Sequence, residues 1–375
     1  MKIVFLSNYY THHQAPFCEA MYEHLGRDFC FIQTTEMSES RRKLGWEMND
    51  IPLFVKKNYG DPSKVAECAA LIENADVIIT GSAPNYLITK HINSGKLVIR
   101  YSERLLKKGL ELWKWPYRQF KFHKDNPKNA NIYMLCASAF TSADYSKFGL
   151  FKNRCYKWGY FPAAKRYSNI DQVIQTKQPN SLLWVARFID WKHPELPVLV
   201  AKKLKEENYS FVMRLIGGGE YEEKIRNMIC EFCLEDCVQL LGVMKPEQVR
   251  EHMEQSQIYL FTSDRNEGWG AVLNESMNSA CAVVASDAIG AVPYLLQNGE
   301  NGFIYPDGNF DELYANVKQL LDSPSTAALL GKKAYETIIT EWNAEVAAER
   351  LLNLISDLQK STGSSRYLEG PCSKA

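Results

Sequence analysis

The sequence lacks any uninterrupted apolar run of 18 residues, so no segment of it predicts a membrane-spanning helix. The opening residues, MKIVFLSNYY, are too short in apolar length for a signal peptide and instead predict a first β-strand. Low-complexity tracts and sequence repeats are also missing. The apolar fraction of 46% and charged fraction of 23% are those of a globular protein. Ten cysteines without secretory targeting predict reduced thiols in a cytoplasmic protein.

Several catalytic motifs are missing too. No Gly-Lys-Ser/Thr follows the glycines of GGGE (217–220), which excludes a phosphate loop of the ATPase kind. Without a Gly-x-Ser-x-Gly, serine-hydrolase chemistry has no support. Cys230 and Cys233 have a zinc-like spacing, but no second cysteine pair or nearby histidine completes a tetrahedral set, so we expect buried thiols there. The absence of Asp-x-Asp disfavours a metal clamp on a phosphorylated substrate.

The net charge is zero, but the two halves of the chain differ. Residues 1–166 hold about 25 Lys and Arg against about 15 Asp and Glu, and the remainder about 19 against about 29. A basic front half and an acidic back half suggest different partners for the two halves. Change of surface charge without any function gives the same pattern. At roughly 100 to 200 residues per domain, the length of 375 residues favours two domains.

Short apolar runs alternate with amphipathic segments along most of the chain. In the front half the runs that predict buried strands are 2–7, 29–34, 76–81, 96–101 and 131–138. In the back half they are 181–187, 210–219, 238–243, 258–263, 282–286 and 302–306, with helices predicted at 194–206, 220–233, 246–255, 271–280 and 310–321. Alternation of this kind predicts an α/β fold with two doubly wound parallel sheets in tandem.

The domain boundaries follow from where the alternation stops. A front domain is predicted at 1–165 and a back domain at 181–340, joined by a linker at 166–180 in a polar stretch that proline interrupts. Helical patterns at 324–341 and 343–360 close the chain, the second as a terminal helix at 341–360. The polar tail at 361–375 is predicted to be disordered.

Two acids bracket a glycine-rich junction between the strand at 258–263 and the helix at 271–280. Ligands of such sheets bind beyond the carboxyl ends of the strands. Gly268 and Gly270 let the backbone approach a ligand closely, and the amides that open the helix favour a phosphate. Because carboxylates repel phosphates, Glu267 and Glu275 must address other groups, and sugar hydroxyls suit them. If the ligand is a nucleotide-sugar, its diphosphate takes the start of the helix, one glutamate holds the ribose and the other holds the transferred sugar.

The Glu-x7-Glu element EGWGAVLNE (267–275) resembles the signature of retaining glycosyltransferases of family 4, which have the GT-B fold. Other segments resemble further motifs of that family in the same order: LLWVARFIDWKHP (182–194), LIGGGE (215–220) and DAIGAVPYLLQNGENGFIYP (287–306). The resemblance covers most of residues 182–306. It implies two Rossmann-like domains that face each other across a cleft, with the terminal helix crossing back to the front domain.

The resemblance also implies a role for each matching residue. Arg187 and Lys192 would grip the donor diphosphate and stabilise its departure, Glu267 would contact the transferred sugar, and Glu275 would hold the ribose. Further donor contacts would come from Gly217, Gly268, Trp269, Gly270 and Ala271. The activity implied is metal-independent, retaining transfer, preferably from a UDP-sugar, to a saccharide or lipid-linked saccharide in polysaccharide biosynthesis. A nucleotide-sugar epimerase of the same fold, or a non-catalytic nucleotide-sugar-binding scaffold, are the alternatives.

The front domain departs from the family pattern. Where the family has paired glycines after the first strand, this chain has His12, His13 and Gln14, and where many members have a histidine after the strand at 96–101 it has Glu103 and Arg104. We expect these residues to contact the acceptor or the transferred sugar, the alternative being that they cap and pack a loop. The sequence leaves open which histidine acts.

Residues 104–128 combine eight Lys or Arg with five aromatic residues. This composition suits a membrane interface with anionic lipid, because aromatic rings lie at the depth of the headgroups. Nucleic acid accepts the same composition, but the rest of the chain offers no nucleic-acid-binding module. A cationic helix packed on its own domain is the plain alternative. The hypothesis is thus a cytoplasmic protein with a peripheral contact at the inner face of the membrane.

Overall fold

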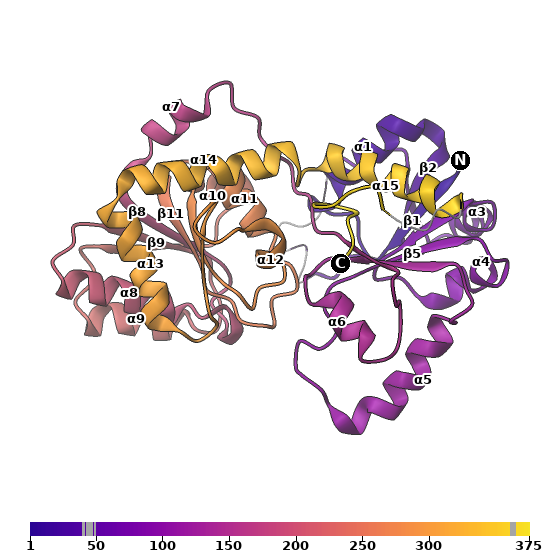
Figure 1. Ribbon diagram of the computed structural model, residues 1–375, viewed down its shortest axis with the longest axis horizontal. Coiled ribbons are helices and arrows are strands. Elements are labelled where there is room, and N and C mark those ends of the chain that lie inside the picture. The colour runs from indigo at the N-terminus through magenta and orange to yellow at the C-terminus, as the bar shows by residue number, and fades with distance from the viewer. Residues whose placement is uncertain (40–41, 43–47, 49, 361–364) are drawn as a thin grey trace. The chain divides into compact units, whose positions relative to one another are not determined.

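The computed structural model describes residues 1–39, 42, 48, 50–360 and 365–375. The chain divides into two compact units, each of which is an α/β domain (Figure 1). Unit 1 comprises Met1–Ala163 together with Asn343–Ala375, and unit 2 comprises Ala164–Trp342. Both sheets are parallel, which confirms the predicted α/β class.

The described residues of unit 1 form a seven-stranded sheet in the order β3-β2-β1-β4-β5-β6-β7. Its strands are β1 (Ile3–Ser7), β2 (Phe29–Gln33), β3 (Val55–Lys57), β4 (Val77–Thr80), β5 (Leu97–Ser102), β6 (Ile132–Cys136) and β7 (Cys155–Lys157). Its helices are α1 (Ala15–Leu25), α3 (Pro62–Glu73), α4 (Thr89–Asn93), α5 (Trp115–Asp125), α6 (Thr141–Ser146) and α15 (Ala344–Gln359), with 3-10 turns at Gly26–Asp28, Asn85–Ile88 and Leu112–Lys114. Every residue of β1 and β2 is buried, as expected for central strands covered on both faces.

The terminal helix α15 belongs to unit 1, where it packs against α1. The other face of the sheet is covered by α3, α4 and α6, which bury Ile72, Ile92 and Tyr145 in one core cluster with strand residues. The predicted crossing of the terminal helix to the front domain is therefore confirmed.

The described residues of unit 2 form a six-stranded sheet in the order β10-β9-β8-β11-β12-β13. Its strands are β8 (Gln178–Val185), β9 (Val212–Ile216), β10 (Val238–Gly242), β11 (Ser256–Phe261), β12 (Ala282–Ser286) and β13 (Phe303–Tyr305). Its helices are α7 (Ile170–Gln175), α8 (Glu195–Glu206), α9 (Glu222–Glu231), α10 (Pro246–Gln255), α11 (Val272–Asn278), α12 (Val292–Leu295), α13 (Phe310–Asp322) and α14 (Pro324–Thr340), with a 3-10 turn at Asp190–Lys192. Helices α8 and α9 lie on one side of the sheet and α10 and α11 on the other (Figure 1).

The structure differs from the sequence-based expectation at both edges of the first sheet and at the linker. Strands β3 and β7 have three residues each and were not predicted, because runs this short carry no periodicity. Residues predicted as a linker, 166–180, contain α7 and the start of β8, and they belong to unit 2.

The prediction of a disordered tail is wrong for residues 365–375. Cys372 and Ser373 are fully buried, and Lys374 forms an antiparallel bridge with Tyr156 of β7. Backbone hydrogen bonds join Lys157 to Ser373 and Cys372 to Lys157 at 2.8 Å each. Pairing with a strand edge satisfies this polar backbone, which local composition cannot reveal. Residues 361–364 of the predicted tail lie outside the described residues.

The cysteines near the end of α9 also differ from expectation, since Cys230 and Cys233 are exposed rather than buried. Helix α9 buries Ile225 and Ile229 instead, and it ends at Glu231. The helical face that packs on the sheet is therefore the isoleucine face, and the two thiols fall outside it.

Candidate functional site

The strand order of unit 2 reverses between β8 and β11: the chain continues from β8 to β9 on one side, and from β11 to β12 on the other. Open α/β sheets bind ligands beyond the carboxyl ends of the strands at such a reversal. Two loops leave the sheet at this point, residues 186–194 after β8 and residues 262–271 after β11. They carry most of the donor-contact residues predicted from the sequence.

Lys192 and Glu267 join the two loops through an ion pair. Lys192 ends the 3-10 turn after β8, and Glu267 lies in the loop after β11. Both side chains are nearly buried, at 12% and 10% exposed, and the Ser263 hydroxyl donates a second hydrogen bond to the Glu267 carboxylate at 3.1 Å. Water screens such a pair little, so the structure holds an opposed charge pair at the reversal point.

Hydrogen bonds from the first residues after β11, one of which is also bonded to β8, fix the backbone next to Lys192. The Thr262 hydroxyl donates to the Lys192 carbonyl at 2.8 Å and itself accepts from the Trp184 indole at 2.8 Å. The Asp264 amide donates to the Trp191 carbonyl at 3.0 Å. Position 192 is therefore set by the sheet and not by loop conformation alone.

Arg187 is exposed at the start of the β8 loop. Its guanidinium lies 5.8 Å from the centroid of the Trp191 ring, and the Lys192 ammonium lies 4.4 Å from the same ring. The indole ring of Trp191 thus attracts both the guanidinium and the ammonium group by cation–π interaction. Arg187 and Lys192, assigned together from the sequence, share this ring.

Glycines hold the loops close together at two places. A Cβ on Gly217 would lie 1.8 Å from the Ala186 carbonyl oxygen, and one on Gly270 would lie 2.5 Å from the Phe261 ring. Both have positive φ, +139° and +90°. Gly217 thus permits the approach of the β9 loop to the β8 loop, and Gly270 the turn into α11. Gly268 is not among the residues with positive φ, so the special conformation expected at both loop glycines holds at Gly270 alone.

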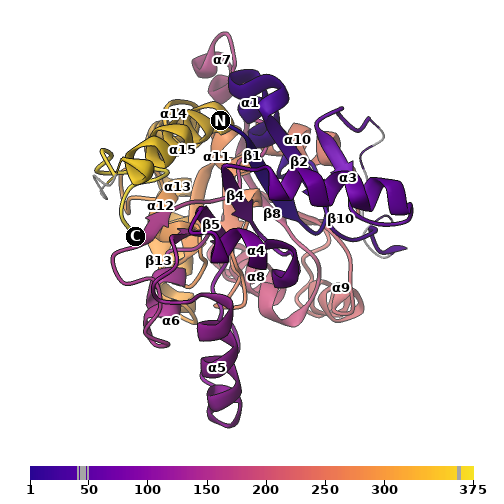
Figure 2. The same ribbon diagram turned by 90° about the vertical axis from the view of Figure 1, so that its right-hand side faces the viewer.

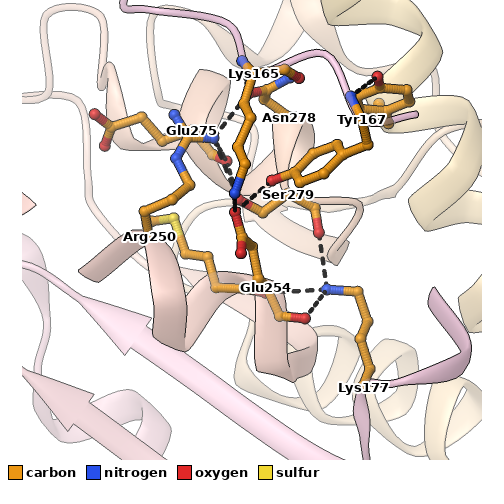
Figure 3. A network of polar contacts seen from close by, with 10 residues as sticks. Lys165, Tyr167, Lys177, Arg250, Glu254, Glu275, Asn278 and Ser279 are labelled. Atoms are coloured by element: carbon orange, nitrogen blue, oxygen red, sulfur yellow. Dashed lines mark hydrogen bonds and ion pairs between the residues drawn. The ribbon is translucent and has the colours of Figure 1, made fainter. Parts of the chain in front are cut away.

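Glu275 lies in the first turn of α11 and is half-buried. Burial raises the pKa of its carboxyl group, and the positive charge of Arg250 opposes that rise. The carboxylate points away from the polar network beside it, which Arg250 joins by donating to Asn278 Oδ1 at 2.8 Å and to the Glu275 backbone carbonyl at 3.3 Å (Figure 3). The carboxylate therefore stays available to a ligand.

The same network fixes the ends of α10 and α11, and sequence reasoning missed it. The ammonium group of Lys177, which is 8% exposed, lies within hydrogen-bond distance of four backbone carbonyls and shares its three N–H groups among them. These are the carbonyls of Met253 (3.0 Å), Glu254 (3.1 Å), Ser256 (2.9 Å) and Ser279 (2.8 Å). Because these carbonyls lie at the C-terminal ends of α10 and α11, the lysine caps both helices at once. Only the fold brings the two ends together, so no local signal marks this residue.

Residues before β8 are tied to the same place. Lys165 pairs with the Glu254 carboxylate at 2.6 Å, and the Tyr167 hydroxyl donates to the same group at 2.6 Å (Figure 3). The Lys165 backbone exchanges hydrogen bonds with the Asn278 side chain at 2.8 and 3.0 Å. The segment predicted as a linker is thus anchored to α10 and α11.

The side chain of Trp269 lies in the core. It is fully buried, packs against Tyr294 and Trp342, and donates from its indole nitrogen to Asn274 at 2.9 Å. The whole residue is buried, so its side chain packs inside unit 2 instead of lying on the surface of the loop. Ala271 is the N-cap residue of α11, which spans seven residues and is shorter than the predicted helix at 271–280.

His193, which follows Lys192, was not predicted as a site residue. It adopts the left-handed conformation with φ of 51°. A hydrogen bond with Glu195 at 2.9 Å, together with the charges of Asp264 and Asp307, raises the pKa of its imidazole. The positive φ of a non-glycine residue at the end of a turn is the feature that sequence could not reveal.

In unit 1 the residues predicted for the acceptor lie at the carboxyl ends of β1 and β5. The rings of His12 and His13 are 3.9 Å apart, and that of His13 lies 6.1 Å from the Tyr160 ring. The Tyr160 hydroxyl donates to the Glu103 carboxylate at 3.0 Å. Burial, aided by the charge of His12, lowers the pKa of His13 to about 3, so that this imidazole is neutral at physiological pH. Tyr160 links the histidines to Glu103, and sequence reasoning missed it because it lies 57 residues from Glu103.

Gln14 and Arg104 have different surroundings. Gln14 is the N-cap residue of α1 and donates to the Ser7 hydroxyl at 3.4 Å. Arg104 is nearly buried, at 10% exposed, with its guanidinium 4.4 Å from the Phe140 ring centroid and 3.9 Å from the Asp144 carboxylate. The contacts of Arg104 therefore correspond to the loop-packing alternative, whereas the Glu103 carboxylate lies in the cluster with Tyr160.

Neither a metal cluster nor a spanning helix is found in the described part of the chain. Among those residues, no group of three or more His, Cys, Asp or Glu is placed to hold a metal ion. Likewise, none of the described helices combines the length and hydropathy needed to cross a membrane.

A family of known proteins matches most of unit 2, including these two loops. Residues 167–337 match the family model of glycosyl transferases group 1. This segment is a group 1 glycosyltransferase domain. The group 1 domain contains both loops at the β8–β11 reversal, the glycine turn after β9 and Glu275.

Curated relatives match about half of the chain. The amylovoran biosynthesis glycosyltransferase AmsK of Erwinia amylovora is 27% identical over 186 residues, 48% of this chain and 46% of AmsK. The poly(ribitol-phosphate) alpha-N-acetylglucosaminyltransferase of Staphylococcus aureus is 28% identical over 172 residues, 46% of this chain and 34% of that protein. The chain thus spans less than half the length of either relative.

Solved structures show the fold of the whole chain. Anabaena Alr3699/HepE, determined in complex with UDP, aligns with a TM-score of 0.71 at 16% identity, covering 95% of this chain and 100% of that one. Together with the two parallel sheets, this likeness identifies the fold as GT-B.

Proposed function

We propose that the chain is a retaining glycosyltransferase that moves a sugar from a nucleotide-sugar, with UDP as the preferred nucleotide, to a saccharide or lipid-linked saccharide. The observation that carries the proposal is the Lys192–Glu267 pair at the β8–β11 reversal of the group 1 domain. A cation and a carboxylate held together there suit a ligand with both a phosphate and sugar hydroxyls. The names of the group 1 relatives from Erwinia and Staphylococcus, and the UDP bound to HepE, support the same class of reaction.

Arg187 and Lys192 would neutralise the charge that grows on the diphosphate as the bond to the sugar breaks. The transition state gains most from charges placed in advance in a site that excludes water, and Lys192 is nearly buried. Because α11 spans only seven residues, the proposal assigns this task to the two cations rather than to the helix. The proposed transfer needs no metal ion, and this is part of the proposal.

Glu267 would accept hydrogen bonds from the transferred sugar and stabilise the positive charge that develops on it, while Glu275 would hold the ribose. The oxygen of the departing phosphate would take the proton of the acceptor hydroxyl, which would attack from the face that the phosphate leaves. Retention of configuration follows from attack on that face. His12, His13 and Glu103 would contact the acceptor or the transferred sugar, with Tyr160 positioning Glu103.

The test begins with a thermal-shift screen against nucleoside diphosphates and nucleotide-sugars. Release of nucleotide and formation of product are then measured with the donor that binds, with and without saccharide acceptors and with a chelator. We expect slow donor hydrolysis alone, transfer in the presence of an acceptor and no effect of the chelator. Glu267→Gln should lose about 100-fold in turnover, and the exposed control Glu300→Gln should not.

Other outcomes identify the alternatives. Conversion of the donor into an isomeric nucleotide-sugar without an acceptor indicates an epimerase. Donor binding with neither transfer nor hydrolysis, unchanged by Glu267→Gln, indicates a binding scaffold. Either result contradicts the proposed transfer.

A further inference from the structure

Helix α5 of unit 1 and the 3-10 turn directly before it expose large apolar side chains that the fold does not use. Leu112 and Trp113 of the turn and Tyr117 and Phe120 of α5 are between 66% and 78% exposed. Within α5, positions 117, 120, 121 and 124 fall on one side at helical spacing, so that Lys121 and Lys124 accompany the aromatic residues. We call these six residues, Leu112, Trp113, Tyr117, Phe120, Lys121 and Lys124, the α5 face. Single exposed apolar residues are common, but a contiguous aromatic group on one helix marks an interaction surface.

The opposite side of α5 holds the helix in place. Trp115 stacks on Phe148 with ring centroids 4.4 Å apart, and Phe122 meets the same ring at 5.0 Å. The His123 imidazole and the Gln119 amide hydrogen-bond to the Phe148 carbonyl at 2.9 and 3.3 Å. These residues attach the helix to its own domain. The α5 face takes no part in that attachment and remains apolar surface exposed to solvent. Helix α5 projects from the rest of unit 1 in both views (Figures 1 and 2).

The charge around the α5 face has one sign. Glu111 pairs with Lys114 and Arg118, and the Asp125 carboxylate accepts a hydrogen bond from Asn85 at 3.0 Å, which turns it toward the domain. Lys121 and Lys124 are exposed, and within the described residues no acid pairs with either. The Lys114 ammonium lies 4.6 Å from the Trp113 ring. Outward from the helix, the aromatic rings are thus accompanied by cations.

We propose that the α5 face docks this protein on a bilayer that contains anionic phospholipid. Trp and Tyr rings lie at the headgroup level, while the long stems of lysine lie along the apolar zone with their charges at the phosphates. The aliphatic Leu112 has no role in stacking on nucleobases, which favours a bilayer over nucleic acid. The surface is independent of the proposed sugar transfer, because vesicle binding involves neither donor nor acceptor.

The experiment is co-sedimentation of the full chain with phosphatidylcholine vesicles, with and without phosphatidylglycerol. We expect binding only to the anionic vesicles and its loss at about 1 M salt, where the Debye length falls to about 3 Å. Lys121→Gln with Lys124→Gln should weaken binding about 30-fold, and Trp113→Ala with Phe120→Ala about 100-fold. Failure to bind anionic vesicles at low ionic strength overturns the proposal.

Matched controls come from exposed residues elsewhere. Lys333→Gln with Lys360→Gln removes the same charge, and Tyr86→Ala with Leu329→Ala removes apolar side chains that are 74% and 52% exposed. Both controls should bind as the native chain does, and so should Glu267→Gln. Equal weakening by the controls overturns the assignment to α5. Thermal unfolding of each variant shows whether it is folded.

A fluorescence measurement locates the contact. Lipids brominated in their acyl chains should quench tryptophan emission in the native chain, and Trp113→Phe should remove most of that quenching. Undiminished quenching in Trp113→Phe places the contact elsewhere and overturns the proposal. Sedimentation equilibrium tests whether another copy of the chain binds the α5 face instead. If the native chain does not bind vesicles, and Trp113→Ala with Phe120→Ala dissociates an oligomer, the α5 face is an interface between copies and the proposal is overturned.

Discussion

The Lys192 ammonium and the Glu267 carboxylate form an ion pair between the loop after β8 and the loop after β11, at the reversal of the strand order. Each charge is nearly buried and satisfied by the other. The two side chains that the proposed reaction assigns to phosphate and to sugar therefore stabilise each other before a ligand arrives. Removing either one leaves its partner as an uncompensated charge.

The first prediction separates the two halves of this pair by nucleotide affinity. Lys192→Met should weaken UDP binding about 10-fold or more, because the phosphate loses a charged hydrogen bond. Glu267→Gln should leave UDP affinity unchanged or improve it, because Lys192 gains freedom to face the phosphate. Titration calorimetry with UDP measures both.

The double variant completes this comparison. Lys192→Met with Glu267→Gln should show a coupling of about 1 kcal/mol or more in unfolding free energy, as contacting charges do. If Glu267→Gln weakens UDP binding as much as Lys192→Met, Glu267 serves only to position the lysine, and its assignment to the sugar is wrong.

A second prediction concerns the pH dependence of UDP binding through Glu275. Burial raises the pKa of this carboxyl group above its usual value. As the pH falls, it therefore takes up a proton while exposed carboxylates are still ionised. The ionised form accepts charge-assisted hydrogen bonds from both ribose hydroxyls, and these are stronger than the bonds that the neutral acid accepts. UDP affinity should therefore be constant near neutral pH and decline toward acid pH, whereas that of Glu275→Gln should be weaker and lack this decline.

The readout is the ratio of the native and Glu275→Gln affinities across the pH range. Protonation of the nucleotide phosphate near about pH 6 affects both proteins equally and cancels in that ratio. A ratio that does not vary with pH would show that Glu275 does not contact the nucleotide through its carboxylate.

A third prediction tests the close approach at Gly217. Gly217→Ala should lower the free energy of unfolding by about 3 kcal/mol, because its Cβ would lie 1.8 Å from the Ala186 carbonyl oxygen. Gly299 has φ of +79° and nothing within 4 Å of such a Cβ, so Gly299→Ala should cost only about 1–2 kcal/mol of backbone strain. Urea denaturation compares the two, and equal losses would contradict the contact.

A fourth prediction concerns the capping of α10 and α11 by Lys177. Lys177→Met keeps about the length of the side chain but removes the ammonium donor that four carbonyls share, which should destabilise the chain by about 3 kcal/mol. The exposed control Lys333→Met should change stability by less than about 0.5 kcal/mol. A native-like stability of Lys177→Met would mean that water replaces the ammonium group.

The sequence was sufficient to predict features that local pattern determines. Continuous apolar runs marked the central strands, and the glycine-rich motif placed Glu267 in the loop after β11. Contacts between elements were not predictable in this way. The burial of Trp269 depends on Trp342, which is distant in the chain, and the position of Arg104 depends on Asp144. Lys177 is the clearest case, because its partners come from two helix ends that only the folded sheet brings together.

The residues that pair with β7 have a consequence for solubility. Strand β7 is the last in its sheet, and an outer strand presents backbone groups that can recruit a strand from another molecule. Residues 372–375 occupy part of that edge, with Cys372 and Ser373 fully buried. Loss of the pairing of residues 372–375 would open this edge and leave the backbone amide and carbonyl of Lys157 without their present partners. Unpaired backbone at an outer strand favours association between molecules, so these residues keep β7 from acting as a site of aggregation.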